Sequence, residues 1–177
     1  MAKLESSSSL LLLIDLQSRL VPAIDEGASV VENARLLLVA AGLLGIPMIF
    51  TEQNPEKLGA TVPELAAEPK PLVHKMSFDA LAAPNFPVGL LDGRSVILVG
   101  CEAHVCVLQT ALGLVDRGAR VFVVADAIGS RRPSSKEASI RRMERHGAEI
   151  VTTEMVLFEW LGTADHPHFR DISKLIR

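Results

Sequence analysis

Cysteine is scarce in this sequence, with two residues in a chain of 177. Together with the lack of a Sec-type leader, this scarcity indicates a reducing compartment, in which a thiol stays free. The early apolar stretch Leu10–Ile14 is too short for a signal sequence, because Asp15 ends it. We therefore predict a cytoplasmic location.

An excess of positive charge and a long hydrophobic run are also missing. The formal net charge is -3, so the chain has no excess of positive charge to attract nucleic acid or an acidic membrane surface. No window of the sequence approaches the run of about 18 apolar residues that a membrane span requires. We therefore expect a small-molecule substrate as the partner, with no nucleic acid and no membrane.

What the sequence does contain is an alternation of short apolar runs with stretches of helical period, separated by Gly and Pro. A length of 177 residues with 49% hydrophobic content suits a single domain over residues 1–177. The predicted strands are Leu10–Ile14, Pro47–Thr51, Leu72–His74, Ser95–Val99, Arg120–Ala125 and Glu149–Val151. The predicted helices are Ser29–Leu44, His104–Arg117, Ser134–His146, Glu154–Leu161 and Phe169–Ile176, with Gly45, Gly118 and Gly147 as helix C-caps.

This repeated βαβ pattern predicts a three-layer α/β/α sandwich, Rossmann-like, around a parallel sheet. The apolarity of the strands is continuous rather than alternating, which is typical of strands buried on both faces. Between the second and third strands, the segment from Glu52 to Pro71 is rich in proline and has no strong periodicity. Loops of this length in compact domains are usually functional, so we expect this one to help build the substrate pocket.

Three residues whose side chains could take part in catalysis lie on one rim of the predicted sheet. Asp15 follows the first strand, Lys75 follows the third, and Cys106 comes just past the fourth, near a helix start that favours a thiolate. Each alone has an ordinary explanation: Cys106 as a small buried residue, Lys75 as a solvated strand end, and Asp15 as a turn cap or a partner of Arg19. Together they form a nucleophile with a base and a stabilising positive charge, a set suited to acyl transfer.

Three motifs containing these residues resemble the isochorismatase-like superfamily of cysteine hydrolases. They are Leu13–Gln17, Lys75–Phe78 and Gly100–Ala111. The segments Thr51–Pro55, Leu58–Gly59 and Thr61–Leu65, with the tail Asp165–Ile176, look closest to its subgroup of isochorismatase domain-containing protein 2 and YcaC-like members.

The resemblance implies a six-stranded parallel sheet and a catalytic triad of Asp15, Lys75 and Cys106. It also implies a non-proline cis peptide between Cys101 and Glu102, with an oxyanion hole made by the backbone N–H groups of Glu102 and Cys106. Asp15 would accept the Cys106 proton and Lys75 would hold the pair in its charged form. A thioester would then form from a small amide-like substrate and be hydrolysed by water that Asp15 activates.

The region after the second strand departs from the metal-binding nicotinamidases of this superfamily. It reads Glu52, Gln53, Asn54, and no His lies between Glu52 and Val73. The nitrogen ligands of such a site are missing, so we expect no metal and no cofactor. The roles of Glu52, Gln53 and His104 in the pocket stay open.

An apolar helix end containing Leu157, Phe158 and Trp160 is either core or a subunit contact, and it fits a homo-oligomer. The leading function is a metal-independent amide hydrolase. One alternative is a binding or assembly protein on the same fold. Another is RNA processing, because some relatives of the subgroup have been described as ribonucleases, although nothing in the composition supports it.

Overall fold

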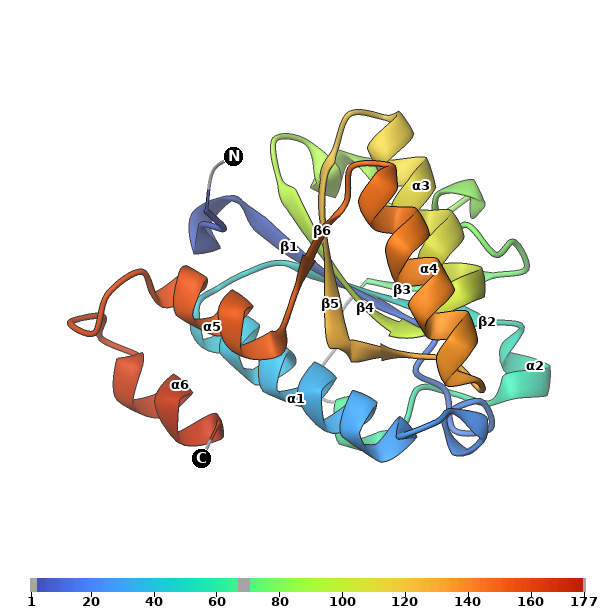
Figure 1. The fold of residues 1–177 in the computed structure, drawn as a ribbon, viewed down its shortest axis with the longest axis horizontal. Coiled ribbons are helices and arrows are strands. Elements are labelled where there is room, and N and C mark those ends of the chain that lie inside the picture. The colour runs from blue at the N-terminus through green and yellow to red at the C-terminus, as the bar shows by residue number, and fades with distance from the viewer. Residues whose placement is uncertain (1–2, 67–70, 177) are drawn as a thin grey trace.

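The computed structural model describes residues 3–66 and 71–176, and within them one sheet of six parallel strands runs in the order β3-β2-β1-β4-β5-β6 (Figure 1). The strands are β1 (Ser9–Ile14), β2 (Met48–Gln53), β3 (Leu72–Lys75), β4 (Ser95–Cys101), β5 (Arg120–Gly129) and β6 (Glu149–Val151). Each predicted strand is confirmed within a few residues.

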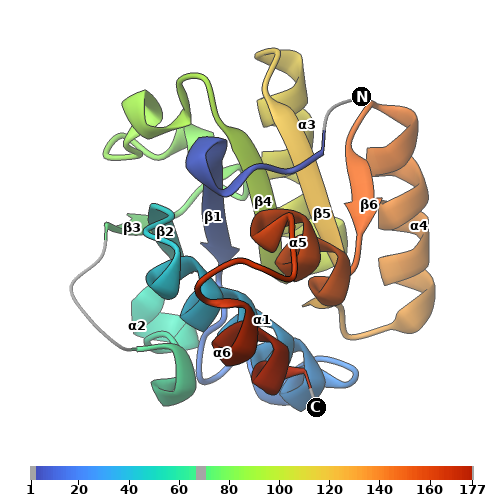
Figure 2. The same cartoon turned by 90° about the vertical axis from the view of Figure 1, so that its left-hand side faces the viewer.

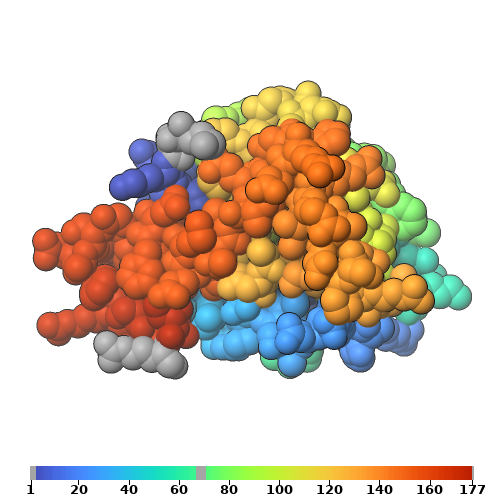
Figure 3. Space-filling view, viewed as in Figure 1, coloured from blue at the N-terminus to red at the C-terminus, as the bar shows by residue number. Residues whose placement is uncertain are grey.

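Helices cover both faces of this sheet (Figures 1 and 2). One face carries α1 (Gly27–Leu43), α5 (Thr153–Leu161) and α6 (Phe169–Leu175), and the other carries α3 (Leu108–Asp116) and α4 (Pro133–Arg145). The predicted three-layer sandwich is therefore confirmed. In the space-filling view, α5 and α6 form one end of the molecule beside α1 (Figure 3).

Burial on both faces explains why the strand sequences are continuously apolar. All six residues of β1 are buried, and so are all seven of β4. Along β1, Leu11 and Leu13 belong to the hydrophobic core beneath α1 and α5, whereas Leu10, Leu12 and Ile14 belong to the core beneath α3 and α4. The central strands thus anchor both layers.

The helix α5 packs back onto the first strand. Trp160 of α5 is 3% exposed and donates a hydrogen bond from Nε1 to Ser9 Oγ at 3.0 Å. Leu157 is fully buried, whereas Phe158 is 42% exposed. Of the apolar helix end, Leu157 and Trp160 are therefore core, and Phe158 is left at the surface.

Helix ends follow the predicted glycines. Gly45, Gly118 and Gly147 stand just past α1, α3 and α4 with φ of 67°, 78° and 103°, in the left-handed region that glycine adopts without strain. The start of the predicted helix at His104 is wrong, because Ala103–Val107 forms a π-helical turn and α3 begins only at Leu108.

The segment from Glu52 to Pro71 contains more structure than its proline content predicts. It includes the end of β2, the short helix α2 (Pro55–Leu58) and a 3-10 turn, and its residues 67–70 lie outside the described part of the chain. Within the described residues, the 3-10 turns are Ser6–Ser8, Val21–Ala23, Pro63–Leu65, Ala80–Ala82 and Val88–Leu91.

Candidate active site

Asp15 and Lys75 form an ion pair at the carboxyl end of the sheet. Asp15 follows β1, Lys75 is the last residue of β3, and β2 lies between these two strands. Lys75 Nζ stands 2.6 Å from Asp15 Oδ2, and both side chains are 0% exposed. The predicted convergence of these two residues on one rim is therefore observed.

Every polar atom at the end of this pair has a partner. Lys75 Nζ also donates to Gln53 Oε1 at 2.9 Å and to the carbonyl oxygen of Ser77 at 3.3 Å. The hydroxyl of Thr51 donates to Asp15 Oδ1 at 2.6 Å. Because an ammonium has three N–H donors, Lys75 is fully satisfied as a cation despite its burial.

The completely buried side chain of Gln17 fixes the backbone that carries Gln53. Its Oε1 accepts from the backbone N–H of Gln53 at 2.8 Å. Its Nε2 donates to the carbonyl oxygens of Gln53 at 3.1 Å and of Gly59 at 2.6 Å. One amide side chain therefore ties the end of β2 to the following loop and holds Gln53 beneath Lys75.

The thiol of Cys106 faces the same pair. Cys106 lies in the π-helical turn, is 6% exposed, and is close enough to Asp15 and Lys75 for both charges to act on its thiol. Burial and the negative charge of Asp15 raise its pKa to about 12, against the opposing effect of Lys75. This direction is opposite to the sequence-based expectation of a thiolate at a helix start, because desolvation and the charge of Asp15 outweigh the nearby cation.

Gly100 brings the end of β4 close to the end of β1. Its φ is +122°, and a Cβ at this position would collide with the carbonyl oxygen of Ile14, so only glycine fits. The peptide bond between Cys101 and Glu102 follows and is cis. The turn carrying Cys106 therefore begins directly beside the residue that precedes Asp15.

The two residues flanking that peptide bond have different surroundings. Cys101 is 1% exposed in the core beneath α1, and burial raises the pKa of its thiol to about 12. Glu102 is 8% exposed, and its Oε2 accepts from the Nε of Arg131 at 3.0 Å and from the backbone N–H of Arg131 at 3.1 Å. The Glu102 carboxylate is therefore paired with a residue 29 positions later in the chain.

Glu52 and His104, whose roles the sequence leaves open, have partners other than the Asp15–Lys75 pair. Glu52 is 4% exposed and its Oε1 accepts from the N–H and the hydroxyl of Thr61, at 2.7 and 2.8 Å, while its Oε2 lies 3.2 Å from His74 Nε2. His104 Nδ1 lies 2.9 Å from Ser130 Oγ. Glu52 therefore ties the loop after α2 to the sheet, and His104 contacts the residue that directly follows β5.

Among residues 3–66 and 71–176, no group of three or more His, Cys, Asp or Glu side chains is placed to hold a metal ion. Over the same residues, no helix has the length and apolarity needed to cross a bilayer.

The family profile of the isochorismatase domain matches residues 9–155. The chain belongs to the isochorismatase domain family. A zebrafish (Danio rerio) relative, isochorismatase domain-containing protein 2, is 40% identical over 176 residues, which are 98% of this chain and 89% of that protein.

Solved structures of isochorismatase-like proteins share the fold. The MAR1 ribonuclease from Caenorhabditis elegans superposes with a TM-score of 0.94 at 39% identity, covering 99% of this chain and 92% of that one. The YcaC gene product of Escherichia coli, described as an octameric hydrolase of unknown specificity, superposes with a TM-score of 0.89 at 25% identity, covering 99% and 95% of the two chains.

Two polar residues of this isochorismatase-like site were not singled out from the sequence. Gln17 and Thr51 both lie inside segments that carry the family resemblance, Leu13–Gln17 and Thr51–Pro55, but the segments alone do not say what their side chains contact. The strand register explains the contacts of both residues. It sets Thr51 beside Ile14, the residue before Asp15, and it sets Gln53, which Gln17 holds, beside Lys75.

Proposed function

We propose that the protein is a cysteine hydrolase that cleaves the C–N bond of a small amide-like substrate through Asp15, Lys75 and Cys106. The observation that supports this most directly is the fully buried Asp15–Lys75 ion pair, whose two charges both act on the buried Cys106 thiol. A buried ion pair contributes little net stability compared with apolar side chains of similar volume. Such a pair beside a potential nucleophile is therefore better explained by chemistry than by folding.

In the first half of the reaction, Asp15 is the general base. The Cys106 thiol is neutral at rest, so its proton passes to Asp15 as the sulfur attacks the substrate carbonyl carbon. The carbonyl electrons move onto oxygen, and the N–H groups of Glu102 and Cys106 are the proposed oxyanion donors, each worth about 10²- to 10³-fold in rate. Asp15 then returns the proton to the leaving nitrogen, the C–N bond breaks and a thioester remains.

In the second half, a water molecule replaces the leaving amine. Asp15 takes one proton from the water, and the resulting hydroxide attacks the thioester carbon. The C–S bond breaks, the acid product leaves, and the sulfur of Cys106 recovers its proton from Asp15. Lys75 stays an ammonium throughout and keeps Asp15 in its carboxylate form between steps.

The test is ammonia release over a panel of small amides, comparing wild type with Cys106→Ser and Cys106→Ala. Activity in wild type and its loss in both variants would support the proposal, as would an acyl adduct on Cys106 in intact-protein mass spectrometry. Activity retained by Cys106→Ala would refute it. Silence of the wild type across amides, imides and thioesters would instead favour a binding or assembly protein.

We also propose that the protein is a homo-oligomer. E. coli YcaC is described as octameric, and this chain exposes Leu72, Met76 and Phe78 at 48%, 71% and 50%, on the edge strand β3 and the loop after it. Light scattering coupled to gel filtration should therefore give a mass above one chain, reduced by Met76→Glu with Phe78→Glu. A monomeric wild type would contradict this proposal.

Ribonuclease activity is the second candidate, and the name of the C. elegans neighbour favours it. A net charge of -3 provides no general attraction for RNA. Cleavage of a labelled RNA by the purified wild type, absent in Cys106→Ala prepared in parallel, would support this activity. Equal cleavage by both would identify a contaminating nuclease.

A further inference from the structure

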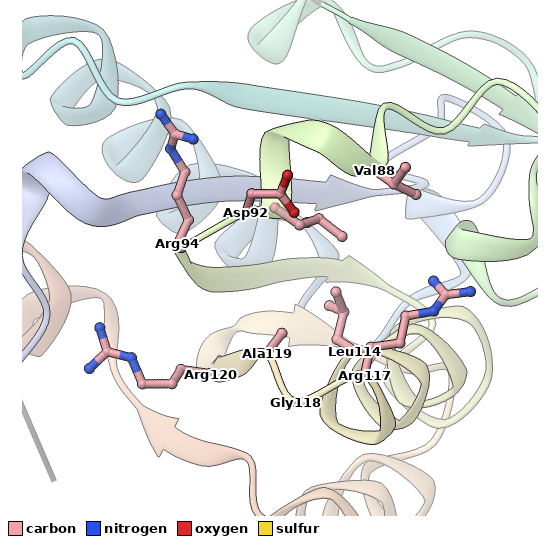
Figure 4. Close-up of a pocket in the computed structure, with 10 residues that line it drawn as sticks. Val88, Asp92, Arg94, Leu114, Arg117, Gly118, Ala119 and Arg120 are labelled. Atoms are coloured by element: carbon pink, nitrogen blue, oxygen red, sulfur yellow. The ribbon is translucent and has the colours of Figure 1, made fainter.

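A pocket of about 640 Å³ lies at the amino end of the sheet, opposite the rim that carries Asp15 and Lys75. Two turns form it, one leading into β4 and the other joining α3 to β5 (Figure 4). Its size is that of small-molecule sites in proteins, about 300 to 1,000 Å³. The seven residues of β4 separate it from the π-helical turn, a span of roughly 23 Å at 3.3 Å per residue.

Positive charge dominates the lining of this pocket. It is lined by Arg94, Arg117 and Arg120, against the single carboxylate of Asp92. Figure 4 shows Arg94 and Arg120 at one end of the pocket and Arg117 at the other, with Asp92 and Ala119 between them. The lining of this pocket thus has a net charge of about +2, whereas the whole chain has a net charge of -3.

The guanidinium groups of these three arginines form no ion pair to 4.0 Å with the residues that the structure describes, 3–66 and 71–176. The Nε of Arg94 is buried without a hydrogen-bond partner, and its Nη1 has only a long contact of 3.4 Å to the carbonyl oxygen of Leu90. A buried donor without an acceptor costs about 1 to 3 kcal/mol, so the Arg94 side chain is held at this position at a cost in stability.

The rest of the lining is apolar and open. Val88, Leu91, Leu114 and Ala119 contribute aliphatic surface. The two turns contain Gly93 and Gly118, with φ of +69° and +78°, and a Cβ at either glycine would have no atom within 4 Å. There is accordingly room for an apolar group between the arginines.

We propose that this pocket binds a small organic anion, meaning an apolar body that carries a carboxylate or a phosphate, with Arg94, Arg117 and Arg120 as its counter-charges. Guanidinium groups pair with both of these acids through charge-assisted hydrogen bonds. The site is separate from the proposed catalytic centre, and the proposal does not depend on the proposed hydrolase activity.

Isothermal titration at low ionic strength tests this with benzoate and phenyl phosphate as probes and benzyl alcohol as their neutral counterpart. The pocket variant is Arg117→Gln with Arg120→Gln, both exposed residues whose replacement should leave the fold intact. The matched control is Arg142→Gln with Arg145→Gln, which removes the same charge from exposed positions on α4. Cys106→Ala serves as the control for binding at the catalytic centre.

We expect at least one of the two anions to bind saturably and benzyl alcohol not to bind. The pocket variant should weaken the Kd about tenfold or more, which corresponds to about 1.4 kcal/mol. The α4 control and Cys106→Ala should each keep the Kd within about twofold. Binding of one anion but not the other identifies which acid the pocket accepts.

Three outcomes would overturn the proposal: no saturable binding of either anion, equal weakening in the α4 control, or loss of binding in Cys106→Ala. Binding of a single-stranded RNA oligonucleotide that needs Arg117 and Arg120, without binding of either small anion, would also overturn it and would assign the pocket to a nucleic-acid backbone.

Discussion

The Nζ of Lys75 lies 2.6 Å from Oδ2 of Asp15, and neither side chain has any exposed surface. The two residues are 60 positions apart in the chain and come from strands that are not neighbours in the sheet. Their contact forms above the end of β2, where Thr51 and Gln53 complete the hydrogen bonding of the carboxylate and the ammonium. Removal of either charge would leave the other buried and uncompensated.

We predict that Lys75→Met lowers the free energy of unfolding by about 3 to 5 kcal/mol, because it leaves the Asp15 carboxylate buried without its cation. The double variant Asp15→Asn with Lys75→Met should recover a large part of this loss, since no charge then remains. Urea denaturation measures both values. Lys57→Met, at an exposed position, is the matched control, and a Lys75→Met protein as stable as wild type would contradict the prediction.

Gln53 should affect activity more than stability. Gln53→Leu removes one acceptor from Lys75 Nζ and one donor to the carbonyl oxygen of Met76. Because small displacements of catalytic groups can cost about 10²-fold in rate, we expect kcat to fall by about that factor while KM changes little. Steady-state kinetics on an amide found by the ammonia screen measures this, with Gln109→Leu on the exposed side of α3 as control. Equal kcat in the two variants would show that Gln53 has no positioning role.

The two cysteines should make the fold sensitive to alkali. Burial raises the pKa of both thiols from 9.0 to about 12, so the folded protein holds these protons more tightly than the unfolded chain does. The stabilisation is complete below about pH 9 and is lost as the pH rises toward 12, at about 1.4 kcal/mol per pH unit for each thiol. Urea denaturation at several pH values should show this slope, and Cys101→Ala with Cys106→Ala should lack it.

The same pKa values can be observed directly. Thiolates absorb in the ultraviolet, and the chain has no tyrosine to interfere at alkaline pH. Thiolate absorbance should therefore be absent from the folded protein near pH 9 and should appear when urea unfolds it at that pH. A full thiolate signal from the folded protein at neutral pH would restore the activated-thiol hypothesis for Cys106.

Glu52 should hold the loop after α2 against the sheet. Its buried carboxylate accepts two hydrogen bonds from Thr61, so Glu52→Ala should cost about 2 to 4 kcal/mol and expose residues 54–66 to limited proteolysis. His74 is 60% exposed in its side chain, and His74→Ala should cost less than about 1 kcal/mol. Similar losses in the two variants would place the main contact at His74 rather than Thr61.

Most of the fold was predictable because strands covered on both faces need continuous apolar sequence, as Leu10–Ile14 and Ser95–Val99 show. The π-helical turn at Ala103–Val107 was not predictable, since its side chains have the same periodicity as the start of an α-helix. This turn packs against α4, which begins more than 20 residues later in the chain. A local sequence pattern does not record that contact.

For the candidate site too, some features follow from the sequence and others only from the tertiary structure. The sequence by itself determined that Asp15, Lys75 and Cys106 follow the carboxyl ends of three strands of one sheet, because parallel strands bring these ends to one rim. Only the tertiary structure decided that burial raises the pKa of the Cys106 thiol and that Thr51 and Gln53 complete the Asp15–Lys75 pair. Burial and hydrogen-bond partners depend on strand register and on contacts between distant residues, which no local pattern records.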